Sequence, residues 1–185
     1  MKFLKFFIVI FISLASSVKA DLNKDLFNQL KEGGKLIFIR HAYAPGSGDP
    51  NNFNLNDCST QRNLSDRGRK QAEHIGIIFR ENKIEIDEVY SSEWCRCKET
   101  AKISFENFST NSFLNSFYSS KFAKNKDKQI DALNNYLLKF KSTINLLCVT
   151  HYVLISEVLN YAPSSGEIVV SDKNFNIIGN IKIDY

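Results

Sequence analysis

The chain has 185 residues, of which 43% are hydrophobic, enough for one domain with a sizeable core. Its 24 basic and 20 acidic residues give a formal net charge of +4, but three of the basic residues lie in the first 20 positions, which hold no acid. The rest of the chain is nearly balanced in charge, so a general nucleic-acid-binding surface has little support and we expect no nucleic-acid partner.

The first 20 residues have the features of a signal peptide. Two lysines precede an apolar run from Phe6 to Leu14, and Val18-Lys19-Ala20 provides the small residues that a signal peptidase needs. The run is too short to span a bilayer comfortably, so we predict a cleaved signal peptide, with an uncleaved anchor as the alternative. We expect an exported protein, periplasmic or secreted, with one domain over residues 21–185 and no stable membrane insertion after cleavage.

Four cysteines fit an exported protein, in which they allow three full pairings. Cys148 lies in a predicted strand, where we interpret it as a small apolar filler. A disulfide from Cys95 or Cys97 to Cys58 would fix the loop that carries Arg96, and we favour such a bond over free thiols. A zinc site is the alternative, but a C-x-C pair with distant partners has poor spacing for one.

The first predicted elements are a helix and a buried strand. Asp21–Lys31 has the spacing of a short amphipathic helix, and two glycines end it. In Leu36–Arg40, four apolar residues lead into Arg40 and His41, as in a buried strand with polar side chains at its C-terminal end. The loop Ala44–Arg62 is long, polar and turn-rich, and a loop of this length usually has a function.

A second amphipathic helix is predicted from Asp66 to about Arg80, with Ser65 as its N-cap. We interpret Gln71 and Glu73 as residues of the helix surface. His74 lies in mid-helix without a partner motif, and we interpret it as structural.

The middle of the chain combines a regular unit with an irregular one. Ile84–Tyr90 is a predicted strand, a helix runs from near Glu93 through Ala101, and Trp94 is expected to be a core or rim aromatic. Ser104–Lys128 is polar, and we predict an irregular crossover that is held to the body by its phenylalanines rather than a disordered segment. These are Phe105, Phe108, Phe113, Phe117 and Phe122.

The remaining segments complete an alternating pattern. Ile130–Phe140 is a predicted helix, Leu146–Thr150 a strand and Val153–Asn160 a helix; Glu167–Ser171 and Phe175–Ile183 then alternate as a β-hairpin. This order predicts an α/β fold, a three-layer α/β/α sandwich whose central sheet is mostly parallel, with an antiparallel C-terminal edge hairpin.

Polar side chains follow three of these strands. Arg40 and His41 follow the first, Ser91-Ser92 and Arg96 the second, and His151 the strand that ends at Thr150. Because the carboxyl ends of parallel strands meet at one edge of a sheet, we expect a cationic pocket there.

Such a pocket is suited to phosphate chemistry. Arginine presents a planar fork that matches phosphate oxygens, so Arg40 and Arg96 can hold a transferring phosphoryl group. A neutral histidine between them can attack phosphorus, and a second, protonated histidine adds a donor. Because arginine and histidine supply the charge that Mg²⁺ supplies elsewhere, we expect no metal and no cofactor.

At these residues the chain resembles the histidine phosphatase superfamily, whose fold is called phosphoglycerate mutase-like. The resemblance covers essentially all of the chain after residue 20. It rests on four segments in the family's order: Arg40-His41, Leu64-Ser65-Asp66-Arg67-Gly68-Arg69-Lys70-Gln71-Ala72, Ser91-Ser92-x-x-x-Arg96-x-x-x-Thr100-Ala101 and Thr150-His151. It implies that His41 is the phosphorylated nucleophile and that Arg40, Arg96 and His151 form the phosphate pocket.

The chain departs from the family pattern in three places. Ala42 stands where the family has glycine, and Tyr152 follows His151 in place of the usual glycine or aspartate. In the crossover, where mutase-like members carry a glutamate proton donor, Phe113–Phe117 contains no acid. Asp49, Glu93 and Glu167 are the candidate proton donors, unless the leaving group is an easily protonated nitrogen that needs none.

The sequence therefore predicts a metal-independent phosphoric monoester hydrolase that acts through a phosphohistidine on His41, with a small phosphorylated substrate. The expected export and the Arg-His-Ala start resemble small periplasmic members that act on lipopolysaccharide core sugar phosphates. The alternatives are a phosphohistidine phosphatase, a mutase, and a catalytically inactive phosphate-binding protein. The sequence indicates no oligomeric state.

Overall fold

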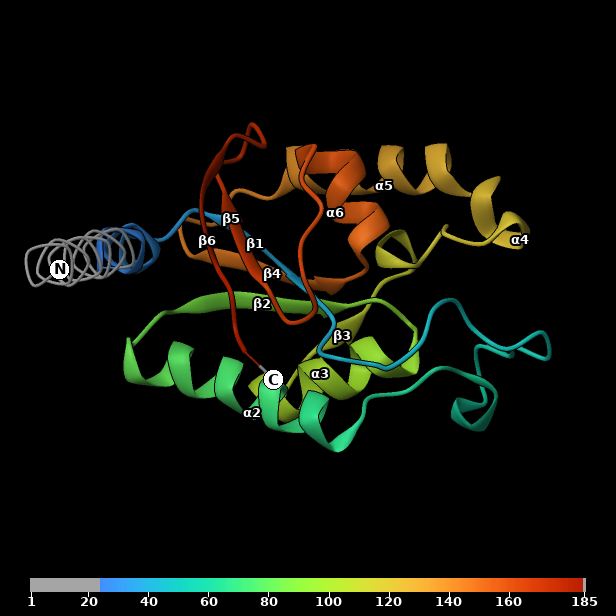
Figure 1. Cartoon of the computed structure of the whole chain (residues 1–185). Coiled ribbons are helices and arrows are strands. Elements are labelled where there is room, and N and C mark those ends of the chain that lie inside the picture. The colour runs from blue at the N-terminus through green and yellow to red at the C-terminus, as the bar shows by residue number, and fades with distance from the viewer. Residues whose placement is uncertain (1–23, 185) are drawn as a thin grey trace, which may run out of the picture.

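The computed structural model describes residues 24–184, and a six-stranded sheet runs through its middle (Figure 1). The strand order is β3-β2-β4-β1-β5-β6; β1 pairs with β4, and β2 with β4 and β3, in parallel, whereas β5 and β6 are antiparallel to their neighbours. The predicted mostly parallel sheet with an antiparallel edge hairpin is confirmed. The strands are β1 (Leu36–Arg40), β2 (Ile86–Ser91), β3 (Ser109–Thr110), β4 (Asn145–Thr150), β5 (Ile168–Ser171) and β6 (Ile177–Ile181).

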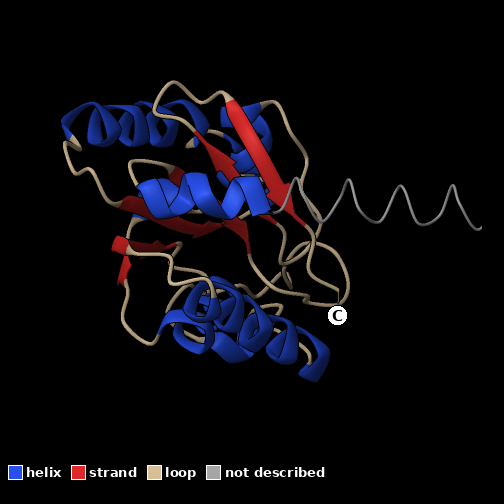
Figure 2. Ribbon diagram, turned by 90° about the vertical axis from the view of Figure 1, so that its left-hand side faces the viewer, coloured by secondary structure: helices blue, strands red, loops and turns tan. Residues whose placement is uncertain are grey.

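Helices cover both faces of the sheet, as Figure 2 shows from the side. α2 (Asp66–Glu81) and α3 (Cys95–Phe105) lie on one face, and α5 (Lys126–Lys139) and α6 (Tyr152–Leu159) lie on the other (Figure 1). The short α4 (Ser120–Ala123) precedes α5, and residues 24–32 are helical. The three-layer sandwich is therefore as predicted. Within the described residues, no helix is both long and apolar enough to cross a membrane. The predicted signal peptide lies outside the described residues.

The two cores follow from the alternation of side chains along the buried strands. Ile37 and Ile39 of β1 pack in the core beneath α2 and α3, whereas Leu36 and Phe38 pack in the core beneath α5 and α6. The side chains of β4 alternate between the two cores in the same way, and Cys148 lies in the second core as a free, buried thiol. Its interpretation as an apolar filler is therefore correct.

The crossover between α3 and α5 is more regular than predicted. It contains β3, a 3-10 turn at Ser112–Leu114 and α4, and α5 begins at Lys126, four residues before the predicted start at Ile130. The predicted start was too late because the first turn of α5 is polar and therefore lacks the apolar periodicity that indicates a helix. Phe113 and Phe117 are buried and hold the crossover to the body, as expected.

Gln71 is not a surface residue, which corrects the sequence interpretation. Its side chain is 1% exposed, accepts the N–H of Tyr43 at 2.9 Å and donates to the carbonyls of Ser165 and Ile183. Gly166, at a φ of +69°, passes so close that a Cβ there would lie 2.3 Å from the Gln71 amide. Gln71 therefore joins the chain after β1 to the loop before β5.

The start of α2 is fixed against the same segment. The Ser65 side chain accepts the N–H of Gly68, which confirms the predicted N-cap, and the Ser65 N–H donates to the carbonyl of Tyr43. A Cβ on Gly68 would lie only 2.0 Å from that carbonyl oxygen. Close packing at Gly68 thus places α2 directly behind the residues that follow His41.

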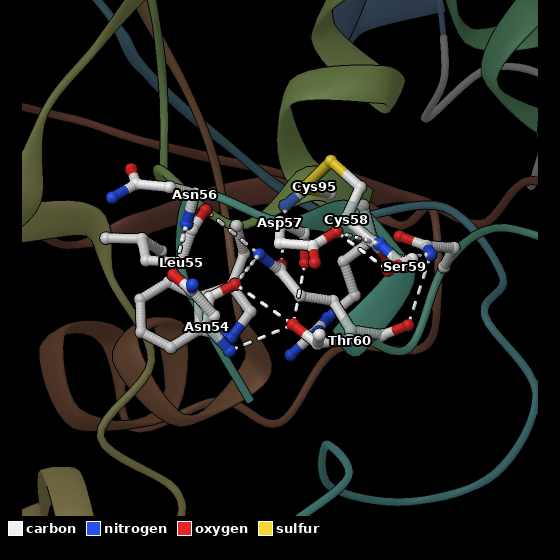
Figure 3. The surroundings of a disulfide bond; sticks show 12 residues. Asn54, Leu55, Asn56, Asp57, Cys58, Ser59, Thr60 and Cys95 are labelled. Atoms are coloured by element: carbon white, nitrogen blue, oxygen red, sulfur yellow. Dashed lines mark hydrogen bonds between the residues drawn. A yellow bond between two sulfur atoms is a disulfide. The ribbon is translucent and has the colours of Figure 1, made fainter. Parts of the chain in front are cut away.

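A disulfide between Cys58 and Cys95 ties the loop after β1 to the first residue of α3 (Figure 3). Cys58 lies in a short 3-10 turn whose N-cap, Asp57, accepts the N–H of Ser59. Cys97 is a buried free thiol. The expected disulfide to Cys58 is present, and Cys95 rather than Cys97 forms it.

Loss of this disulfide is expected to weaken the fold. A double Cys58→Ser, Cys95→Ser variant should lose about 2–4 kcal/mol of free energy of unfolding, because the bond closes a long loop. Urea unfolding with and without dithiothreitol measures the effect. Reductant should bring the wild type to the level of the variant and leave the variant unchanged; an effect of reductant on the variant would contradict this assignment.

Candidate active site

A pocket of about 290 Å³ opens at the C-terminal ends of β1 and β4. Arg40, His41, Arg96 and His151 all line it, so the structure brings together the four residues that the sequence singled out. The loop after β1 and the segment that leads into α4 form the rest of the rim, at one end of the molecule (Figure 1).

The backbone carbonyl of the next residue orients the His41 ring. The side chain is 2% exposed, and Nδ1 lies 2.8 Å from the carbonyl oxygen of Ala42. A carbonyl only accepts, so Nδ1 carries the hydrogen and Nε2 keeps its lone pair. Burial, together with the positive charges of Arg96, Arg62 and Arg40, lowers the pKa of His41 well below its usual value. His41 is thus a neutral imidazole with a nucleophilic Nε2.

Arg40 is held at the rim from two sides. Its Nη1 donates to the carbonyl of Pro163 at 2.9 Å, and its guanidinium lies 5.2 Å from the ring centroid of Tyr152. Tyr152 stands where the family has glycine or aspartate. A cation–π contact of this kind stabilises a partly exposed arginine by about 0.5–1 kcal/mol, so the departure has a structural use.

Arg96 forms a two-point ion pair with Asp49. Nη1 and Nη2 lie 2.7 and 3.2 Å from the two carboxylate oxygens, and Arg96 is 3% exposed. The carboxylate also accepts from Trp94 Nε1 and from the N–H of Arg62. Burial acts to raise the pKa of Asp49, but the hydrogen bonds and charge of Arg96 outweigh it and lower the pKa below its usual value. Asp49 is therefore ionised and fully engaged, which makes it a poor proton donor.

Arg62 is a pocket residue that the sequence reasoning missed. It lines the same cavity, and its side chain is held by carbonyls of its own loop: Nε donates to Gly48 at 2.8 Å and Nη1 donates to Ala44. Burial and the nearby charge of Arg96 lower its pKa to about 10, so it stays cationic at neutral pH. Only its position at the end of a long, turn-rich loop could have indicated it.

His151 is buried between several pocket groups. Its Nε2 lies 2.9 Å from Ser92 Oγ, its Nδ1 lies 3.5 Å from Arg96 Nη2, and its ring makes edge contacts with His41 and Trp94. Burial and Arg96 lower the pKa of His151 well below its usual value. The expectation of a protonated second histidine therefore does not hold for the ligand-free protein. Trp94 is 3% exposed and forms part of the pocket wall, as a core and rim aromatic should.

Glu93 and Glu167, the other two candidate proton donors, do not line this pocket. Glu93 binds the side-chain amide of Asn115. Glu167 is 1% exposed and accepts from the N–H of Ser164 and the hydroxyl of Tyr161. It thereby holds the loop whose Pro163 carbonyl binds Arg40. Among the pocket-lining residues of the described chain, Asp49 is the only carboxylate.

The charges of the pocket favour an anion. Arg40, Arg62 and Arg96 contribute three positive charges, Lys121 at the mouth adds a fourth, Asp49 removes one, and both histidines are neutral. The net charge of about +3 complements a phosphate monoester, which carries about −1.5 to −2 at neutral pH. Within residues 24–184, no group of three or more histidine, cysteine, aspartate or glutamate side chains is arranged to hold a metal ion.

The mouth of the pocket combines aromatic rings with hydroxyl groups. Phe53 stacks on Trp94, and Phe122 meets both rings edge-on. Tyr118 contacts Tyr152 on the rim. Polar residues complete the opening: Ser47, Asn51, Ser116, Ser119, Ser120 and Lys121.

The histidine phosphatase superfamily (branch 1) is the family whose model matches the chain, over residues 36–113. The matched part runs from β1 past β3 and includes Arg40, His41 and Arg96, whereas His151 lies beyond it. No curated protein matches the sequence.

Solved structures with the same fold cover most of the chain. TTHB049 from Thermus thermophilus is 12% identical, with a TM-score of 0.59, and the alignment covers 80% of this chain and 99% of that one. The putative phosphohistidine phosphatase SixA from Agrobacterium tumefaciens is 15% identical, with a TM-score of 0.56 and coverage of 80% and 98%. A phosphoglycerate mutase from Thermus thermophilus is 12% identical, with a TM-score of 0.52 and coverage of 81% and 99%. The predicted phosphoglycerate mutase-like fold is confirmed.

Proposed function

We propose that the chain is a member of the histidine phosphatase superfamily, whose family model it matches over residues 36–113, and that it is a phosphatase that hydrolyses a phosphate monoester through a phosphohistidine on His41. One observation carries the proposal: a neutral histidine with a free Nε2 lies in a pocket whose positive charge complements a phosphate dianion. Nucleophile and electrostatic complement are thus present together.

Binding precedes the reaction. The phosphoryl oxygens take the place of water around Arg40, Arg62 and Arg96, and His151 adds a contact at its ring nitrogen. These groups are already in position, so little reorganisation is needed as charge redistributes over the equatorial oxygens. Asp49 keeps Arg96 in place without itself receiving phosphate.

The reaction then has two displacements. Nε2 of His41 attacks phosphorus as the ester P–O bond breaks, and the leaving oxygen departs with the bonding pair and takes a proton to become an alcohol. Water next attacks the phosphohistidine, the N–P bond breaks, and inorganic phosphate leaves with His41 neutral again. The Nδ1–H bond to Ala42 holds the ring in the required orientation throughout.

The mouth of the pocket favours a small, hydroxyl-rich leaving group such as a sugar. Phe53 and Phe122 offer apolar faces, while the neighbouring serines and Asn51 offer hydrogen bonds. Together with the expected export, which the disulfide supports because such bonds persist in oxidising compartments, this favours a sugar phosphate of the cell envelope.

A phosphohistidine phosphatase is the second candidate, and the pocket carboxylate favours it. Asp49 is ionised and engaged, so an alkoxide leaving group has no carboxylic acid in the pocket to protonate it, which forfeits about 10²–10⁴-fold of rate. The nitrogen of a phosphoramidate is protonated without such help. The shared fold with SixA agrees with this candidate.

Rates on matched substrates separate these functions. We expect the protein to hydrolyse p-nitrophenyl phosphate, whose leaving group needs no acid. Under the first candidate, a sugar phosphate should be hydrolysed at a comparable kcat/KM, because contacts between the sugar and the mouth of the pocket offset the missing acid. A phosphohistidine peptide cleaved more than about 10²-fold faster than the sugar phosphate would favour the second candidate. A chelator should leave all rates unchanged. Oxyanion binding without turnover of any of the three would show an inactive phosphate-binding protein.

The pH profile of kcat/KM is expected to follow the substrate and not the free enzyme. Burial and the pocket arginines lower the pKa values of both histidines well below 6.5, so the titration near pH 6 belongs to the phosphate ester. His151 can bond to a phosphate oxygen only when it carries a second proton, so the productive complex holds the dianion and one added proton. We therefore expect kcat/KM to be level below the second pKa of each ester and to fall about tenfold per pH unit above it. A midpoint that stays the same for esters of different pKa would contradict this and point to a group of the enzyme.

A further inference from the structure

A chain of hydrogen bonds connects His151 to residues outside the pocket. His151 Nε2 lies 2.9 Å from Ser92 Oγ, which lies 3.1 Å from Asn115 Oδ1. Asn115 in turn makes two bonds to Glu93: Oδ1 accepts the backbone N–H at 2.9 Å, and Nδ2 donates to Oε2 at 2.6 Å. Neither Asn115 nor Glu93 lines the pocket, so both act on it only through Ser92 and His151.

The two bonds to Glu93 fix the orientation of the Asn115 amide. A backbone N–H can only donate, so the amide oxygen must face the N–H of Glu93, and the amide nitrogen then donates to the Glu93 side-chain oxygen. A flipped amide would place donor against donor and acceptor against acceptor. Asn115 therefore presents an acceptor, Oδ1, to Ser92.

The orientation of Asn115 decides the direction of the Ser92 hydroxyl. Ser92 has one hydrogen, and it must point to Asn115 Oδ1. The oxygen of Ser92 then accepts from Trp94 N–H at 3.3 Å and from His151 Nε2. Cys97 Sγ, 3.5 Å from Nε2, adds no competing charge, because burial raises the pKa of the thiol to about 12.

We propose that Asn115 and Ser92 are positioning residues that hold His151 as the Nε2–H tautomer, so that Nδ1 is the atom it offers to a bound phosphate. The identity of the ligand as a phosphate rests on the proposed function, whereas the tautomer of His151 in the free protein is independent of it. In the free protein Nδ1 bears a lone pair, 3.5 Å from Arg96 Nη2. A phosphate oxygen is also an acceptor, so His151 can bond to it only after Nδ1 gains a proton. Oxyanion binding then takes up one proton.

The surroundings of His151 agree with uptake on binding. Arg96 and Cys97 of α3, Arg40 and His41 after β1, and Arg62 of the loop with its partner Asp49 are the charged and titratable groups that surround it. Burial and the three arginines together keep the free imidazole neutral. A bound dianion offsets their charge and restores the affinity of Nδ1 for a proton.

Nitrogen NMR of the histidines tests the tautomer directly. Only three histidines are present, and His74 is exposed and can be assigned with a His74→Gln variant. In ligand-free protein at pH 7.5 we expect His41 as the Nδ1–H tautomer and His151 as the Nε2–H tautomer. In Asn115→Leu the Ser92 hydroxyl is free to donate to Nε2, so His151 should change to the Nδ1–H tautomer. A doubly protonated or Nδ1–H His151 in the wild type, or an unchanged tautomer in Asn115→Leu, overturns the proposal.

A charge exchange provides the matched control. Asn115→Asp combined with Glu93→Gln keeps an acceptor toward Ser92 and reverses the bond between the two side chains, so it should restore the Nε2–H tautomer. Should Asn115→Leu fail to fold, Ser92→Ala is the second variant. It removes the hydroxyl oxygen that accepts from His151 Nε2–H, so His151 should again lose its preference for the Nε2–H tautomer.

Proton uptake is the second measurement. Calorimetry with tungstate, a dianion that does not titrate at pH 7.5, is run in buffers of different ionisation heat. The wild type and the exchanged variant should take up about one proton per tungstate bound, and Asn115→Leu close to none. Equal uptake in all three overturns the proposal. Neither readout involves turnover, so failure of the proposed phosphatase activity and failure of this inference are distinguishable.

Discussion

His41→Ala is expected to abolish turnover of p-nitrophenyl phosphate, with a loss of roughly 10⁴–10⁶-fold in kcat. His41 is the pocket histidine whose Nδ1 is bonded to a carbonyl and whose Nε2 is left free, so its removal takes away the nucleophile. The fold should survive, because alanine leaves the backbone bonds of this position in place. Initial-rate assays, with circular dichroism as a check on folding, measure the effect.

A trapping experiment extends this prediction to the intermediate. Wild-type protein mixed with labelled ester and quenched in alkali should carry label on His41, bound as an acid-labile phosphoramidate, and His41→Ala should carry none. His74→Ala is the matched control, since it removes an exposed histidine of α2 and should behave as the wild type. Label on another residue, or full activity in His41→Ala, would contradict the nucleophile assignment.

The residues of the site that could be predicted from the sequence are those tied to strand ends. A continuous apolar run that ends in polar residues indicates where a buried strand stops, and parallel pairing then brings the ends together. Arg40 pairs with Thr150, the residue before His151, so these two strand ends lie side by side. Arg96 was predictable because its helix follows directly on β2.

The residues that were missed have side chains whose role depends on tertiary packing. Gln71 looks like a surface residue in the sequence, and only the close passage of Gly166 and the C-terminal segment buries it. Arg62 lies in a loop without periodicity, so its direction is decided by carbonyls of Ala44 and Gly48. The choice of Cys95 over Cys97 is likewise set by the rotation of α3, which turns Cys97 toward the core and His151.

The three predicted proton donors show the same limit. Asp49 lines the pocket, and Glu93 and Glu167 lie within one or two contacts of a pocket residue. Their hydrogen-bond partners, however, engage each carboxylate as a support: Asp49 for Arg96, Glu93 for Asn115 and Glu167 for the loop that binds Arg40. The pocket therefore offers no free carboxylic acid to a leaving group.

Arg62→Ala should reduce kcat/KM by about 10²–10³-fold, the loss typical of one preorganised donor in a charge-stabilising site. Removing one of three arginines takes one positive charge from the pocket, so inhibition by tungstate should weaken as well. Arg62→Lys keeps the charge but not the planar fork and should recover only part of the loss. Steady-state kinetics with tungstate inhibition constants measure both effects.

Arg67→Ala is the control for this prediction, because it removes the same charge from an exposed position in the first turn of α2 and should leave kcat/KM within about twofold. Arg62 also donates to two carbonyls of its loop, so its loss could act through the fold alone. The two roles give different results. A purely structural role would lower the free energy of unfolding while tungstate inhibition stayed within a few-fold, and Arg62→Lys would then match Arg62→Ala. A direct role predicts weaker tungstate binding in Arg62→Ala at a free energy of unfolding close to that of Arg62→Lys, which assigns the third arginine to the phosphate.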